Sequence, residues 1–149
     1  TNTPNIGDIE QLIYAKVNNA RGGSLRLDTQ LAEVARSHSQ DMIERGFFSH
    51  TNPSGEGPTE RAKRMGVQTE IDKGEYILIG IAENIALTPT GNVLGCGYVY
   101  SADEIVECTV QGWIESPGHY QNIIDKRYSE TGIGVATDGT TYYLTQVFR

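Results

Sequence analysis

The sequence predicts an α+β fold in a single domain spanning residues 1–149. Three helical segments occupy the first 65 residues, a strand pattern follows, and after two more helical segments a β-hairpin pattern closes the chain. Because helices come first and strands are then interrupted by helices, the elements indicate layers rather than alternating βαβ units. A chain of 149 residues can bury one hydrophobic core without metal or disulfide support.

Composition excludes several partners. The chain carries 19 acidic and 12 basic residues, a net charge of −7, and has no basic cluster. Nucleic acid and anionic membrane surfaces would be repelled on average, so we expect neither as a partner. Its apolar runs are too short for a membrane span, so none is expected.

The first two helices follow from apolar spacing. Residues at helical intervals in the first segment are Ile9, Leu12, Ile13, Val17 and Ala20, with Gly22 and Gly23 as the stop. Asp28 is a suitable N-cap for the second helix, and Gly46 suits the position after its C-cap. His38 falls on the apolar stripe of that helix, so we expect a packed core histidine with bonded ring nitrogens and assign it no chemistry.

His50 lies between two predicted elements. It follows the end of the second helix and comes just before residues 52–55, where Pro and Gly favour a tight turn. Gly57 and Pro58 then begin a short third helix that runs through Met65. A helix exit followed by a turn holds the histidine in a defined place.

Glu83 stands in a row of isoleucines. The alternate positions of this stretch are Ile77, Ile79, Ile81, Glu83 and Ile85, so in one strand their side chains share a face. The residues on the opposite face are also apolar, which suggests that the strand is buried on both sides. A carboxylate buried there needs a cation, a metal or several hydrogen-bond donors. If the strand ended before Glu83, the residue would be an exposed loop acid. The alternation favours the buried interpretation.

Cys96 and Cys108 are the only cysteines, and they are either two free thiols or one disulfide. Neither belongs to a Cys-x-x-Cys pair, which makes a thiolate zinc site improbable. Residues 88–100 are rich in Gly, Thr and Asn and indicate a long loop that carries Cys96. Cys108 lies off the core stripe of the next helix, free to meet that loop, so we favour the disulfide.

Two consecutive helices meet at Pro117. Ser101 and Glu104 form a capping-box pattern at the start of the first, and Pro117 stops it because it disfavours helical backbone at Ser116. The same proline can begin the second helix with Ser116 as N-cap. His119 then lies at the positive helix end, which favours neutral imidazole, the form that binds a metal or accepts a proton. The alternative is a turn histidine bonded to nearby backbone.

The closing hairpin has the clearest pattern. Residues 132–136 and 141–148 are rich in β-branched and aromatic side chains. Asp138 and Gly139 between them favour a two-residue type I′ turn.

Five stretches in this order resemble the CAP superfamily of cysteine-rich secretory proteins, venom antigens and pathogenesis-related proteins, and most closely its prokaryotic SCP-like branch. They are Leu31…Ala35…His38…Asp41-Met42, residues 48–55 (FSHTNPSG), 82–85 (AENI), 113–123 (WIESPGHYQNI), and 132–135 (GIGV) with Gln146-Val-Phe148. The resemblance covers about residues 6–148. It implies a three-layer α-β-α sandwich with a central antiparallel sheet.

The resemblance also implies a cleft lined by two histidines and two acids, which in some family members holds a divalent metal such as zinc. The matching residues are His50, His119 and Glu83, with Ala82 in place of the family's glycine. The second acid is less direct. Longer members place it three residues after the Trp, which here is Ser116, whereas Glu115 is two after it and turned about 200° from Trp113 on a straight helix. Glu115 is carried as the fourth ligand, with Ser116 or water as alternatives.

We expect a secreted, monomeric binding or interaction module whose partner is a cell-envelope component, a lipid or another protein. Residues 1–5 carry no leader, as expected of a processed mature chain. The alternative function is a metal-dependent hydrolase with Glu83 as general base and a metal-bound water. A Ser-His-Glu hydrolase using Ser49 or Ser116 ranks last, since neither serine stands in a nucleophile-elbow context.

Overall fold

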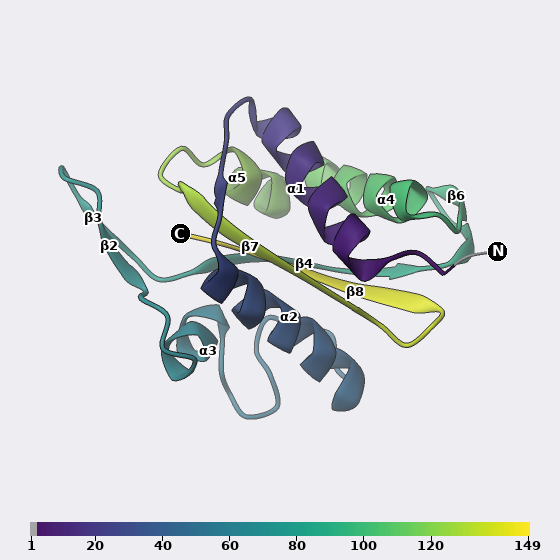
Figure 1. The fold of residues 1–149 in the computed structure, drawn as a ribbon, viewed down its shortest axis with the longest axis horizontal. Helices are drawn as coiled ribbons and strands as arrows, with labels where there is room; N and C mark the ends of the chain where they lie inside the picture. The colour runs from purple at the N-terminus through teal and green to yellow at the C-terminus, as the bar shows by residue number, and fades with distance from the viewer. Residues whose placement is uncertain (1–2) are drawn as a thin grey trace.

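Two helical layers enclose a four-stranded sheet in this computed structural model, which describes residues 3–149. Helices α1, α4 and α5 cover one face of the sheet, and α2 and α3 cover the other (Figure 1). The three-layer α-β-α sandwich is therefore confirmed. Our interpretation of residues 1–5 as the start of a mature chain falls partly on residues 1–2, outside the described residues.

The sheet has the strand order β1-β7-β8-β4. The strands are β1 (Arg26–Leu27), β4 (Ala82–Pro89), β7 (Glu130–Thr137) and β8 (Thr141–Phe148). Strand β8 pairs antiparallel with both β7 and β4, and only the two-residue β1 runs parallel, to β7. Strand β4 thus forms one edge of the sheet.

The first two helices begin and end close to where their caps predict. Helix α1 (Ile6–Arg21) ends at Gly22, whose φ of 68° is left-handed. Helix α2 (Thr29–Glu44) begins after Asp28, whose carboxylate accepts from the Leu31 N–H at 2.9 Å. Gly46, with φ of 66°, follows the α2 C-cap as predicted.

Helix α2 packs on β7 backbone against backbone. A Cβ atom at Gly132 would lie 2.1 Å from the Leu31 carbonyl carbon, and one at Gly134 would lie 2.0 Å from the Arg36 nitrogen. Any side chain larger than hydrogen would push the helix off the sheet. This close approach fixes α2, and with it His38, against the strands.

Hydrophobic cores fill both interlayer spaces. The larger core, between the sheet and α1, α4 and α5, includes Ile9, Ile13, Val17, Val110, Trp113, Ile133, Tyr142, Leu144 and Phe148. The smaller core, between the sheet and α2 with α3, consists of Leu31, Val34, Ala35, Ala62, Val67, Ile81 and Val147.

The predicted continuous strand through Glu83 is wrong, because the extended conformation is interrupted at Gly80. Gly80 has φ of 95°, a conformation that other residues rarely adopt. Before it, β3 (Ile77–Ile79) pairs with β2 (Glu70–Asp72) in a separate hairpin that projects from the body (Figure 1). Ile77 and Ile79 are 60% and 74% exposed, so they do not share a buried face with Glu83.

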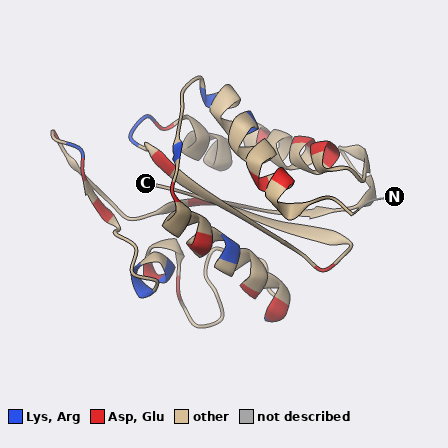
Figure 2. Cartoon of the chain, in the orientation of Figure 1, with Lys and Arg blue, Asp and Glu red and all other residues tan. Residues whose placement is uncertain are grey.

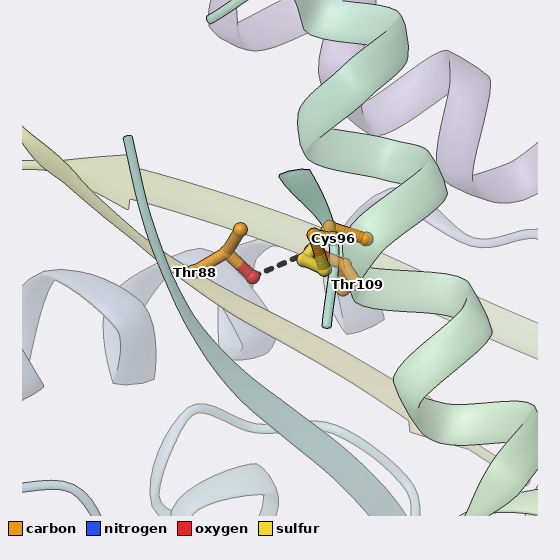
Figure 3. Close-up of a disulfide and its surroundings, with 4 residues drawn as sticks. Thr88, Cys96 and Thr109 are labelled. Carbon is orange, nitrogen blue, oxygen red and sulfur yellow. Dashed lines mark hydrogen bonds between the residues drawn. A yellow bond between two sulfur atoms is a disulfide. The ribbon is translucent and has the colours of Figure 1, made fainter. Parts of the chain in front are cut away.

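The predicted loop at residues 88–100 is also wrong in part. Strand β4 continues to Pro89, and β5 (Gly91–Val93) and β6 (Gly97–Val99) form a second small hairpin. Its turn carries Cys96, which forms the favoured disulfide with Cys108, with a Cα–Cα distance of 5.5 Å. Beside the disulfide, the Thr88 and Thr109 hydroxyls share a hydrogen bond of 2.7 Å that joins β4 to α4 (Figure 3). The hairpin is therefore fastened to the helix by a covalent bond.

The remaining helices match their predicted signals. They are α3 (Pro58–Arg64), α4 (Ala102–Glu115) and α5 (Pro117–Ile124). Ser101 and Glu104 form the reciprocal capping box at the start of α4. Within residues 3–149, none of the helices combines the length and the apolar character needed to cross a bilayer.

The turn between β7 and β8 differs from the predicted type I′. That turn needs positive φ at both central residues, and no described residue other than glycine has it. Instead, the Asp138 carboxylate accepts from the backbone N–H groups of Thr140 and Thr141 at 3.0 and 2.9 Å. Hydrogen bonds to the Asp138 side chain therefore stabilise this turn, in place of the two residues with positive φ that a type I′ turn requires.

Candidate functional site at the start of strand β4

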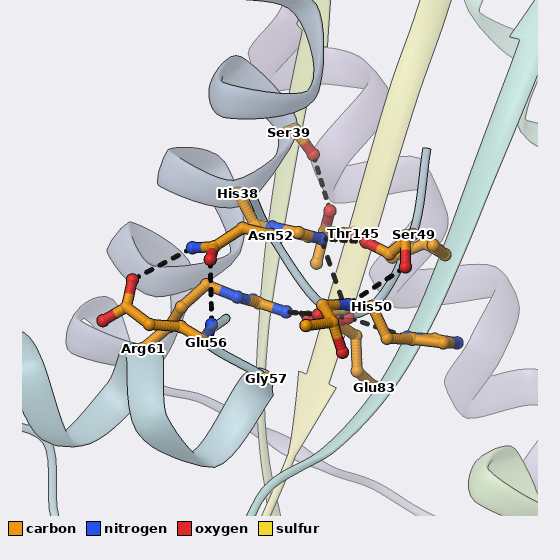
Figure 4. Close-up of polar contacts among 12 residues, drawn as sticks. His38, Ser39, Ser49, His50, Asn52, Glu56, Gly57, Arg61, Glu83 and Thr145 are labelled. Atoms are coloured by element: carbon orange, nitrogen blue, oxygen red, sulfur yellow. Dashed lines mark hydrogen bonds and ion pairs between the residues drawn. The ribbon is translucent and has the colours of Figure 1, made fainter. Parts of the chain in front are cut away.

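Glu83, the second residue of β4, is buried and fully hydrogen-bonded. Its Oε1 accepts from His50 Nδ1 at 2.8 Å and from Arg61 Nη2 at 3.1 Å, and its Oε2 accepts from Arg61 Nη1 at 2.8 Å (Figure 4). The residue is 6% exposed. The interpretation of Glu83 as a buried strand carboxylate that needs a cation, a metal or several donors is thus confirmed, although the strand begins later than predicted.

The cation is Arg61, on α3. Its guanidinium binds Glu83 through two nitrogens, and Nη2 also donates to the His50 carbonyl at 2.6 Å. Arg61 is 2% exposed, so the ion pair is desolvated. Sequence reasoning predicted the need for a cation, a metal or several donors but did not identify Arg61, which lies 22 residues before Glu83 and reaches it only through tertiary packing.

His50 is oriented by Glu83. The chain segment after α2 leaves its side chain 50% exposed, with Nδ1 turned inward to the carboxylate. An ionised carboxylate only accepts, so Nδ1 carries the proton and Nε2 of the neutral ring keeps its lone pair. The ring therefore presents a basic nitrogen away from the buried ion pair.

Opposing effects act on Glu83. Burial alone would raise the pKa of its carboxyl group, but the hydrogen bonds from His50 and Arg61, together with the Arg61 charge, hold the pKa below its usual range. Glu83 is therefore ionised at neutral pH.

His38 lies behind this group and is buried in the core as expected, but only one of its two ring nitrogens is bonded, whereas both were expected to be. Its Nε2 is 2.9 Å from the Ser49 carbonyl, which can only accept, so Nε2 carries the proton. Its buried Nδ1 has no partner in the described part of the chain. Burial lowers the pKa of His38. A neutral ring 3.9 Å from Glu83 Oε1 thus closes the inner side of the site.

His119 lies on α5, in the helical layer on the opposite face of the sheet from α2 and α3, and is hydrogen-bonded to the residue next to Glu83. Its Nδ1 is 2.8 Å from Ser116 Oγ, and its carbonyl accepts from Asn84 Nδ2 at 3.0 Å. Asn84 follows Glu83 in β4 and is held by Asn122 of α5 at 2.9 Å. Burial lowers the pKa of His119, and the positive charge that His50 carries when protonated lowers it further. His50 and Glu83 are thus in direct contact, and His119 is linked to them through Asn84, the neighbour of Glu83 in β4.

Glu115 takes a different position. It is exposed at the end of α4 and accepts from Gln111 Nε2 at 2.8 Å. No hydrogen bond within residues 3–149 links it to His50, Glu83 or His119. Ser116, the alternative considered for the fourth position, does contact His119.

The donor set limits what a metal would find here. Within the described chain, no group of three or more His, Cys, Asp or Glu side chains is arranged to hold a metal ion. Both carboxylate oxygens of Glu83 are already bonded, to Arg61 and His50. The ring nitrogens that these contacts leave open are the Nε2 atoms of His50 and His119, because Glu83 and Ser116 contact the two Nδ1 atoms.

Comparisons with known proteins agree with this fold. Residues 15–148 match the cysteine-rich secretory protein family, CAP. The uncharacterized protein YkwD of Bacillus subtilis is 28% identical over 124 residues, which are 83% of this chain and 38% of YkwD. The chain thus spans well under half of that relative, so the whole relative's activity does not transfer.

Two solved structures of bacterial proteins have a similar fold. An extracellular protein containing an SCP domain from Bacillus anthracis has a TM-score of 0.69 and 27% identity, covering 95% of this chain and 40% of that one. An outer surface protein of Borrelia burgdorferi has a TM-score of 0.71 and 17% identity, covering 97% and 95% of the two chains.

Proposed function

Because the chain belongs to the CAP family of cysteine-rich secretory proteins, we propose that it is a secreted binding or interaction module whose His50–His119 site holds a divalent metal such as zinc. The proposed ligands are the Nε2 atoms of the two histidines. Glu83 acts as the group that orients His50, and Glu115 is left out of the ligand set. Bound there, a metal would supply open coordination positions for donor atoms of a partner.

One observation carries this proposal: the carboxylate–imidazole contact of 2.8 Å between Glu83 and His50. Histidines that bind metals usually donate their other ring nitrogen to a carboxylate or carbonyl, which fixes the tautomer and raises ligand basicity. Arg61 keeps Glu83 ionised in its buried position, so His50 Nε2 is prepared as a ligand. The Ser116 hydroxyl contacts His119 Nδ1, and with this hydroxyl as acceptor the Nε2 atom of His119 has a free lone pair for the metal.

The same geometry argues against the hydrolase alternatives. A general base needs a free lone pair and a proton affinity near the working pH. Glu83 has both oxygens occupied and a lowered pKa. Ser116 and His119 do make a serine–histidine contact, but no carboxylate within residues 3–149 bonds the other ring nitrogen. Binding is therefore the function we propose.

Secretion is supported by two observations. Structural disulfides form and persist in oxidising compartments, and this chain has one between Cys96 and Cys108. The Bacillus anthracis protein with the same fold is described as extracellular. The proposed partner is one that a secreted protein encounters: a cell-envelope component, a lipid or another protein. We propose that this protein binds it as a monomer.

Titration calorimetry with zinc, cobalt and cadmium at about pH 7.5 tests the metal site. We expect saturable binding that drops at least about tenfold in His50→Ala and His119→Ala, and that weakens as pH falls through the imidazole range because protons compete. Glu115→Gln serves as the control and should bind like the parent. The absence of saturable binding in the parent would contradict the proposal. Chelator-sensitive cleavage of peptide, ester or glycan substrates would favour the hydrolase.

A further inference from the structure

A groove of about 800 Å³ lies at the other end of β4 from the histidines. Its walls are the last residues of β4, the β5–β6 hairpin and the outer face of α4. The Cys96–Cys108 disulfide lies in its lining and fastens the hairpin to the helix. The groove has a defined shape because all three walls are fixed.

Strand β4 presents its free edge at this groove. The N–H of Thr90, just past the strand, donates to Thr140 at 2.9 Å, so even-numbered residues bond towards β8. In an antiparallel pair the direction alternates, so the backbone groups of odd-numbered residues point out of the sheet. Two side-chain contacts agree with this register: Trp113 Nε1 donates to the Ile85 carbonyl at 3.0 Å, and Asn122 Nδ2 donates to the Glu83 carbonyl at 3.2 Å.

Only one outward-facing residue keeps both backbone groups open. The carbonyls of Glu83 and Ile85 are occupied by these side chains, and Pro89 has no N–H. Leu87 faces Tyr143 at a non-hydrogen-bonded position of this register, so its N–H and C=O point away from β8, and Leu87 is 41% exposed. Unpaired edge groups of this kind are templates for another extended chain.

The groove is acidic. Its lining includes Asp103, Glu104, Glu107 and Glu115 and no lysine or arginine. Figure 2 shows acidic segments along α4, a helix whose sequence has no basic residue. Of these four acids, Glu107 alone has a basic partner within residues 3–149, namely Lys16. An occupant therefore has to bring positive charge.

The occupant we propose is an extended basic peptide segment of a partner protein, which adds one residue to the β4 edge by exchanging two hydrogen bonds with Leu87. Even-numbered β4 side chains face α4, as the Thr88–Thr109 contact of 2.7 Å shows. The two peptide residues that flank the bridged one point to the same side, into the acidic groove. The structure thus specifies a basic–apolar–basic sequence in the partner.

Arginine suits the flanking positions better than lysine. The Tyr98 ring lines the groove, is 67% exposed and stacks on Tyr100, and a guanidinium can stack on such an exposed aromatic pair. A neutral or anionic lipid would bring no positive charge to neutralise these carboxylates. This site is separate from the proposed metal site and does not depend on it.

Three short peptides test the proposal on the intact protein: acetylated and amidated TRVRT, its acidic counterpart TEVET, and TRVRT with an N-methyl group on valine. We expect TRVRT to bind and to shift the Leu87 amide resonance in nitrogen-15 NMR spectra. N-methylation removes the donor to the Leu87 carbonyl and should weaken binding about tenfold. TEVET should not bind detectably, and the affinity for TRVRT should fall with added salt.

Matched protein variants separate charge from fold. Asp103→Asn with Glu115→Gln should weaken TRVRT binding about tenfold. Glu33→Gln with Glu44→Gln removes the same charge from exposed positions on α2, across the sheet, and should leave the affinity unchanged. His50→Ala should also leave it unchanged.

Three outcomes would overturn the proposal. The first is equal binding of TRVRT and TEVET, and the second is equal binding of the N-methylated peptide. The third is a Leu87 shift that follows protein concentration without peptide, which would assign the edge to a second copy of this chain.

Discussion

The two ends of strand β4 contrast sharply although they belong to one eight-residue element. At Glu83 the side chain is buried, ionised and bonded at both oxygens. At Leu87, four residues later, the side chain is 41% exposed and the outward backbone groups are open. The strand itself does not explain this, because both residues point the same way in the pleat.

The difference comes from what covers each end. Helix α3 and the segment carrying His50 close over Glu83, and Arg61 fills the space with a cation. The β5–β6 hairpin stands away from Leu87, held to α4 by the disulfide. One end is therefore built to orient a histidine, and the other leaves an edge available.

The largest effect is expected at the buried ion pair. Arg61→Met leaves Glu83 buried without a counter-charge and should lower the free energy of unfolding by about 3–5 kcal/mol, measured by urea denaturation. Arg64→Met, on the same helix, breaks the exposed contact with Glu56 and should cost less than about 1 kcal/mol. Similar losses in the two variants would contradict the contrast between the ends.

Alanine substitutions along one face of β4 sharpen the comparison. Ile85→Ala removes a side chain that is 6% exposed and should cost about 3 kcal/mol of unfolding free energy. Leu87→Ala, two residues on, should cost less than about 1 kcal/mol because much of its side chain is already in water. Both values come from chemical denaturation, and a costly Leu87→Ala would show that this end is also packed.

Removal of the disulfide tests the hairpin end. Cys96→Ser with Cys108→Ser should lower the unfolding free energy by about 3 kcal/mol in the chain-entropy estimate for a short loop. The Leu87 amide should exchange with solvent no more slowly than in the parent, while metal binding at His50 stays intact. Loss of metal binding in this variant would mean that the two ends are coupled.

The smallest effect is the pH dependence of the Glu83 end. His38 and His119 have lowered pKa values in the folded state, so the unfolded chain takes up protons first as pH falls below about 6.5. Stability should therefore decline from neutral pH into that range. It should decline again below the usual carboxyl range, because the depressed pKa of Glu83 stabilises the fold only while the group is ionised. Denaturation curves at several pH values check both phases, and His38→Gln should flatten the first.

Local signals in the sequence predicted much of the fold and part of the site. Asp28, Ser101 and Pro117 begin their helices where capping and proline chemistry require. The isoleucine alternation led to the buried Glu83 by a partly mistaken route, since Gly80 breaks the strand and only the residues after it remain in the sheet. A glycine inside an apolar run was the signal that should have shortened the strand.

The sequence alone determined the helix limits, the cysteine pairing and the need of Glu83 for a positive partner, because these depend on residues close together in the chain or on the desolvation cost of one carboxylate. Tertiary packing alone decided that Arg61 is that partner, that Glu115 faces the groove rather than the histidines, and that Leu87 remains open. Such outcomes depend on how α3, α4 and the β5–β6 hairpin settle around a strand far from them in sequence, and no local pattern encodes that arrangement.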